Sequence, residues 1–94
     1  MPRGFSLEQN YPNPFNPVTT ITFSLAQDAH VRITVYNLKG QKIEVLEDGF
    51  RKEGEYHVVF DGKDLSSGVY LCRLAATTRS GNDFTTTRKL LLIK

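Results

Sequence analysis

The residue types that most often carry catalysis are scarce in this chain, which has one cysteine, Cys72, and two histidines, His30 and His57. A nucleophilic cysteine needs a base within hydrogen-bond reach. Cys72 alternates in phase with Tyr70 and Leu74, which predicts burial, and a buried thiol is usually inert. One cysteine and two histidines also fall short of the four ligands of a structural zinc site. We therefore expect no enzyme activity, no metal site and no cofactor.

Acidic and glycine residues offer two further kinds of site. Asp61, Asp64 and Asp83 could bind calcium if their loops met at one end of the fold. Their spacing does not match a calcium-binding loop, and Lys63 would repel a cation, so turn-forming aspartates are favoured. The glycines are isolated and form no phosphate-binding loop.

Exposed aromatic residues could form a sugar-binding platform, for which Tyr11, Phe15 and Tyr36 are the candidates. The chain has no tryptophan, the aromatic most expected on such a platform. The competing interpretation is that Phe15 packs under the first strand and Tyr36 covers a sheet edge. A carbohydrate- or cell-wall-binding module of a secreted hydrolase therefore stays as the alternative function.

Size and charge restrict the class of protein. The chain of 94 residues suits one domain, which we place at residues 5–94, with residues 1–4 as a linker or an artificially added start. The net charge of +2 comes without a basic block, so we expect no nucleic-acid partner. No apolar run approaches the roughly 20 residues of a membrane span, and residues 1–4 do not resemble a signal peptide. A single cysteine excludes an internal disulfide but leaves the compartment open.

Alternation of inward and outward residues predicts an all-β fold. Strands of this kind place every second residue on a core. The expected inward residues are Ile21, Phe23 and Leu25; Val31, Ile33 and Val35; Ile43 and Val45; Tyr56, Val58 and Phe60; Tyr70, Cys72, Leu74 and Ala76; and Phe84, Thr86, Arg88, Leu90 and Leu92. With a short strand near residues 5–9, this predicts an immunoglobulin-like antiparallel β-sandwich of about seven strands, with Greek-key order as the usual choice. Residues 41–50 also show a helix-like spacing, but the window is short and uncapped, so a strand is favoured.

Turn residues separate these runs. Asn37-Leu38-Lys39-Gly40 predicts a hairpin with Gly40 in the left-handed region. Asp61-Gly62 and Ser80-Gly81-Asn82 predict two more reversals.

The least generic stretch contains Asn10, Pro12, Asn13, Pro14, Asn16 and Pro17. A residue before proline is restricted to extended geometry, so we expect a stiff extended segment. It could cover a sheet edge or act as a recognition tag, and the cover is favoured on physical grounds.

Several motifs resemble a known family. Residues 9–17 (QNYPNPFNP), followed by Thr19-Thr20-Ile21, resemble the opening motif of type A sorting domains of the type IX secretion system. Similar family motifs follow in order at residues 35–40 (VYNLKG), 60–62 (FDG), 65–70 (LSSGVY) and 89–94 (KLLLIK). The immunoglobulin-like domain of flagellar hook-capping proteins shares the strand motifs, so a structural domain of that kind is a third alternative.

The resemblance implies a non-catalytic C-terminal module of a larger exported protein. Its partners would be the outer-membrane secretion translocon, a cell-surface sortase and the N-terminal cargo domain of the same precursor. The protein would pass through the periplasm and end at the cell surface or be secreted.

We expect the final strand to be the main recognition element, because a terminal strand with an open edge could add to a partner sheet. A tight turn and the Asn-Pro segment are secondary candidates, and plain structural roles are the competing interpretation for all three. The predicted recognition residues are Lys89, Leu90, Leu91, Leu92, Ile93 and Lys94; Ser67, Gly68, Val69 and Tyr70; and Asn10, Pro12, Asn13, Pro14, Asn16 and Pro17.

Overall fold

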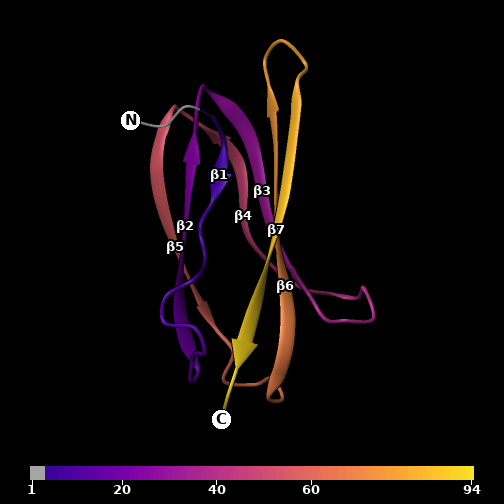
Figure 1. Cartoon of the computed structure of the whole chain (residues 1–94). Helices are drawn as coiled ribbons and strands as arrows, with labels where there is room; N and C mark the ends of the chain where they lie inside the picture. Colours follow the sequence, from indigo (N-terminus) through magenta and orange to yellow (C-terminus); the bar gives the residue numbers. More distant parts are fainter. Residues whose placement is uncertain (1–3) are drawn as a thin grey trace.

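Seven β-strands organise residues 4–94, the part of the chain that this computed structural model describes (Figure 1). They are β1 (Ser6–Leu7), β2 (Val18–Leu25), β3 (Ala29–Tyr36), β4 (Lys42–Arg51), β5 (Gly54–Asp61), β6 (Gly68–Thr78) and β7 (Asp83–Leu92). Three of the four residues predicted to form a linker or added start, residues 1–3, lie outside the described part. No helix long and apolar enough to cross a membrane occurs among residues 4–94.

The strands form two antiparallel sheets, with strand orders β1-β2-β5 and β4-β3-β6-β7, that lie face to face (Figure 1). The chain changes sheet after β2, after β4 and after β5, so β5 returns beside β2 and β6 beside β3. This is a Greek-key sandwich, and the predicted immunoglobulin-like fold is confirmed. In the order typical of antibody constant domains the fourth strand would join the sheet of β2 and β5. Here β4 pairs with β3 instead.

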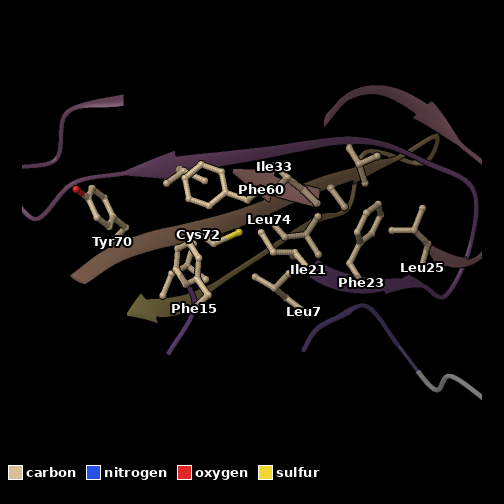
Figure 2. Packing of buried hydrophobic residues seen from close by; sticks show 14 of the residues in the cluster. Leu7, Phe15, Ile21, Phe23, Leu25, Ile33, Phe60, Tyr70, Cys72 and Leu74 are labelled. Atoms are coloured by element: carbon tan, nitrogen blue, oxygen red, sulfur yellow. The ribbon is translucent and has the colours of Figure 1, made fainter. Parts of the chain in front are cut away.

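Apolar side chains from both inner faces form one core (Figure 2). Among its fully buried members Phe15, Phe23 and Phe60 are the largest. The predicted alternation holds along β2, β3 and β6, where the inward residues are buried as expected. Each buried side chain of this size contributes about 1.5–3 kcal/mol through removal of apolar surface from water.

Strand β4 departs from the predicted alternation. Val45 was expected inside with Ile43, but it is 39% exposed, whereas Ile43 and Leu46 pack against the core. The register against β3 shifts twice, leaving first Leu46 and then Ile43 without a partner residue. Such β-bulges rotate the following residues onto the other face. The helix-like spacing of this window therefore reflects two bulges in an edge strand.

The predicted hairpin at residues 37–40 is confirmed. Gly40 has a φ of +84°, and its N–H donates to the Asn37 carbonyl at 3.0 Å. The Asn37 side-chain oxygen accepts from the N–H groups of Lys39 (2.9 Å) and Gln41 (3.0 Å) and so holds the turn.

The two other predicted reversals also occur. Gly81, with a φ of +90°, lies in the hairpin between β6 and β7. Asp61-Gly62 ends β5 and begins the connection that carries the chain to β6 in the other sheet.

Candidate functional site

The three segments predicted for recognition, within residues 10–17, 67–70 and 89–94, meet with a few neighbouring residues at one end of the sandwich, where the C-terminus lies in Figure 1. Residues 9–17, 62–70 and 89–94 together are called the C-terminal corner from here on. Phe15 forms a parallel bridge with Leu92. The Gly62 N–H donates to the Pro17 carbonyl at 2.8 Å, and the Lys94 N–H donates to Ser67 Oγ at 2.9 Å. Segments far apart in the sequence therefore share one surface.

Asn10 anchors the Asn-Pro segment from inside. Its side chain is buried, and its amide nitrogen donates to Thr19 Oγ1 (3.0 Å) and to the Pro12 carbonyl (3.1 Å). Thr19 Oγ1 in turn donates to the same carbonyl at 2.8 Å. The segment is bent rather than extended as predicted, because these bonds turn it back onto β2. The peptide bonds preceding Pro12, Pro14 and Pro17 are cis.

The backbone of the Asn-Pro segment occupies the outer edge of the last strand. The Phe15 N–H donates to the Leu91 carbonyl, and the Ile93 N–H donates to the Phe15 carbonyl, both at 2.9 Å. These are the groups that an added partner strand would need.

Side chains complete this cover. Asn13 Oδ1 accepts the Leu91 N–H at 3.0 Å, and Gln9 Nε2 donates to the Lys89 carbonyl at 2.7 Å. The expectation that residues 89–94 present an open edge is therefore wrong for this stretch. The edge cover, which physical reasoning favoured, is what the segment forms.

The contact between the two chain ends continues toward the other end of β7. Arg88 lies on the inner face of β7, as predicted, because it pairs with the core residue Cys72. At this open side of the sandwich it is nevertheless exposed, and its Nε donates to the Leu7 carbonyl of the other sheet at 2.7 Å. Phe5 stacks on Phe84 with ring centroids 5.4 Å apart. Residues 5–17 thus run alongside β7 in the same direction and close one side of the sandwich. They are called the N-terminal seal below.

Phe15 is the apolar centre of the C-terminal corner. It is fully buried and lies 5.9 Å from Phe60 between ring centroids (Figure 2). Gly62 leaves room for it, because a Cβ there would lie 3.5 Å from the Phe15 ring and 3.1 Å from Leu92 Cδ2. The Asn-Pro segment therefore packs with the Asp61-Gly62 turn and with the last strand.

The connection before β6 is fixed by Tyr70, whose hydroxyl donates to the Ser66 carbonyl at 2.6 Å. This arrangement is the tyrosine corner of immunoglobulin-like sandwiches. In that motif a tyrosine bonds a backbone carbonyl a few residues upstream and lies two residues before a core cysteine, here Cys72. Tyr70 therefore stabilises this connection.

Lys94 closes the corner from the other side. Its Nζ donates to the Leu65 carbonyl at 2.8 Å and also to the Lys63 carbonyl. The last residue therefore fastens the C-terminus to the connection between β5 and β6.

The predicted recognition residues divide into buried and accessible ones. Asn10, Tyr70, Leu90 and Leu92 are buried, and Pro17, Gly68 and Val69 are half-buried. Pro12, Asn13, Pro14, Asn16, Ser67, Lys89, Leu91, Ile93 and Lys94 are exposed. Tyr11, at 81% exposure, Ile93 at 49% and Leu91 at 37% are the exposed large apolar residues of the corner. A partner would contact these accessible side chains.

Sequence reasoning missed three residues that build the corner: Gln9, Thr19 and Gly62. Gln9 and Thr19 lay within the motif but gave no separate signal. Gly62 was assigned only to a turn, although a glycine between two apolar segments can also mark a close approach.

The thiol of Cys72 is not poised for chemistry. Cys72 is fully buried, and desolvation raises its pKa to about 12. The nucleophilic thiolate is therefore suppressed.

The two histidines lie on solvent faces of different sheets. His57 Nδ1 is 2.8 Å from Thr22 Oγ1. His30 Nε2 is 3.1 Å from Asp48 Oδ1. Desolvation acts to raise the pKa of Asp48, but the hydrogen bonds and positive charges of Arg32 and His30 together outweigh it, so the pKa is lowered.

Acidic residues do not gather within residues 4–94. Asp61 lies near the C-terminal corner, whereas Asp83 begins β7 at the opposite end. No group of three or more candidate metal ligands occurs in this described part.

The three aromatic residues considered for a sugar platform do not form one. Phe15 is buried, Tyr11 bridges to β2, and Tyr36 belongs to the other sheet. Among these three residues, stacking on a sugar ring could use only one of the two tyrosines at a time.

The fold and the corner define a small immunoglobulin-like sandwich whose distinctive residues meet at its C-terminal end. A crystal structure of CopC from Methylosinus trichosporium OB3b is similar, with a TM-score of 0.53 and 13% identity over 94% of this chain and 92% of that one. At this identity the likeness supports the fold alone. No curated protein matches the chain. The family of secretion system C-terminal sorting domains matches residues 9–93, so the chain belongs to this family, whose domains are sorting signals for type IX secretion.

Proposed function

We propose that this domain is a folded, non-catalytic tag that takes an N-terminal cargo through the outer membrane and leads to its attachment at the cell surface or its release. The observation that supports this most is the convergence of the three motif segments in one corner with exposed side chains. Family membership supports export by the type IX machinery. The buried Cys72 and the separated histidines favour a binding role.

The partners in this proposal are the outer-membrane translocon, met in the periplasm, and the surface sortase. They would contact the exposed apolar side chains of Leu91 and Ile93, with Lys89 beside them on the same face of β7. Phe5 lies near the opposite end of the sandwich from the C-terminus (Figure 1). A cargo joined upstream would therefore leave the corner accessible.

A secretion assay tests the proposal. A periplasmic reporter is fused upstream of residues 5–94 in a host that has the type IX system. The double substitution Leu91→Glu and Ile93→Glu places two charges on the proposed surface without touching the core residues Leu90 and Leu92. We expect the reporter to stay in the periplasm.

The matched control is Leu38→Glu, because Leu38 is 68% exposed in the β3–β4 hairpin, outside the corner. It should be delivered like the unchanged domain. Circular dichroism of the purified variants checks that both are folded. Normal surface delivery of the folded double variant would refute the assignment of this surface.

A further inference from the structure

A hollow of about 180 Å³ lies in the outer face of the four-stranded sheet, and none of its lining residues belongs to the C-terminal corner. Its lining residues are Arg32, Thr34 and Tyr36 of β3 and Arg73 and Ala75 of β6. β3 and β6 are the two central strands, each with a neighbouring strand on both sides, so neither offers a free edge. Anything in the hollow must therefore be held by side chains.

Two of the lining residues have free hydrogen-bonding capacity. Thr34 is only 2% exposed, and its hydroxyl takes part in no side-chain hydrogen bond among residues 4–94. No buried side-chain oxygen or nitrogen in the described residues lacks a partner, so this hydroxyl is open to the hollow, where it could bond a ligand oxygen. Arg73 lies directly opposite Thr34 in the register, and its guanidinium forms no ion pair or hydrogen bond within the same part of the chain.

The surroundings of the hollow are basic. Lys42 and Lys89 lie on the same face in the adjoining strands β4 and β7. The adjoining acidic residue, Asp48, is paired with Arg32 at 3.3 Å and with His30 at 3.1 Å. The face therefore carries an excess of positive charge that favours an anion.

We propose that this hollow binds an acidic sugar through its carboxylate. The carboxylate pairs with the Arg73 guanidinium and accepts a hydrogen bond from Thr34, while Arg32 and the Tyr36 ring flank the sugar. Arginine suits this role because its planar fork matches a carboxylate. An acidic peptide is less suitable, because peptides commonly bind by adding a strand to a free sheet edge and the central strands offer none. The proposal is independent of the sorting function.

Titration of the 94-residue chain, followed by amide NMR shifts, tests this site. The probes are galacturonate, the neutral sugar galactose and a poly-glutamate peptide. We expect galacturonate to shift the amides of Thr34 and Arg73 and to bind more weakly as salt is added. Shifts confined to other residues, or equal binding of galactose, would overturn the carboxylate site. Equal binding of poly-glutamate at Thr34 and Arg73 would overturn the sugar assignment.

Three substitutions distinguish binding at this site from a general effect of positive charge. Arg73→Gln should weaken galacturonate binding about ten-fold, since a hydrogen bond to a charged group is lost. Arg79→Gln removes the same charge from a residue that instead lies over the Phe50 ring, and should leave binding unchanged. Thr34→Val should weaken binding several-fold without unfolding the protein, because the hydroxyl makes no bond there. Equal affinities of all three variants and the unchanged chain would refute the proposal.

Discussion

Gly62 shows how one residue without a side chain holds the C-terminal corner together. Its N–H bonds the Asn-Pro segment at Pro17, and its carbonyl accepts the Leu65 N–H at 2.9 Å. Its missing Cβ leaves space that Phe15 and Leu92 fill. The contact of Gly62 with Phe15 and Leu92 therefore allows residues 9–17, 62–70 and 89–94 to pack together.

Gly62→Ala should therefore destabilise the domain. The added methyl would lie 3.1 Å from Leu92 Cδ2, closer than carbon atoms normally pack. Overpacking of this size costs about 1–3 kcal/mol, measurable as a lower free energy of unfolding in urea. Gly4→Ala is the control, because nothing lies within 4 Å of that position and it should change little. Equal losses in both variants would contradict the close packing.

Cys72 should make stability depend on alkaline pH. Its pKa is raised from 9.0 to about 12 by burial, so above pH 9 the unfolded chain ionises this thiol while the folded chain does not. The stabilising effect is complete below pH 9 and is lost as the pH rises toward 12, at about 1.4 kcal/mol per pH unit. Denaturant unfolding of the reduced protein at pH 8, 9 and 10 measures the loss. Cys72→Ala should lose less stability over this range, and an identical loss in both proteins would contradict the burial of the thiol.

At the scale of elements, β7 has two different halves. Its C-terminal half is hydrogen-bonded to the N-terminal seal. In its first half, the outward N–H groups donate to no backbone carbonyl of the described residues. The regular register with β6 places the N–H groups of Thr85 and Thr87 on the same side as that of Leu91. The run of threonines there keeps this short open edge polar.

Hydrogen exchange should distinguish these halves. The amides of Leu91 and Ile93 should exchange slowly, and those of Thr85 and Thr87 quickly, when followed by NMR in deuterated buffer. Asn13→Ala removes the acceptor of the Leu91 N–H and should speed exchange at Leu91 more than at Ile93, whose partner is a backbone carbonyl. Fast exchange at Leu91 and Ile93 in the unchanged protein would show that the seal does not form in solution.

The elements also show what could be predicted from sequence. Alternation located β2, β3 and β6 because none of these strands contains an extra, unpaired residue; the two bulges of the β3–β4 pairing lie in β4. It failed at β4, since a bulge is visible only when the partner strand is known. Phe15 could be suspected of packing under the first strand, but its pairing with Leu92 is a contact between chain ends that no local pattern encodes. The hollow was missed for the same reason: Thr34 and Arg73 become neighbours only through the register of β3 with β6.

For the whole molecule, the last strand is part of the fold as well as part of the proposed recognition surface. Removal of residues 89–94 would delete the core side chains Leu90 and Leu92. Truncation of a buried leucine costs about 2–5 kcal/mol, and a domain has only about 5–15 kcal/mol in total. We expect the shortened chain to be largely unfolded by circular dichroism and thermal melting. A cooperative melting transition in the shortened chain would contradict this, and such a deletion cannot separate loss of recognition from loss of folding.

The N-terminal seal determines how the domain resists unfolding by a force applied between its two chain ends. A cargo upstream of Phe5 and a machine that grips the C-terminus would pull the two chain ends in opposite directions along neighbouring, parallel segments. Such a force slides the segments past each other and strains the bonds at Arg88, Leu91 and Ile93 at the same time. A force that pulled one segment away from the other at its end would instead break these bonds one after another. Under the proposed function, this arrangement would help the domain to stay folded while it is pulled.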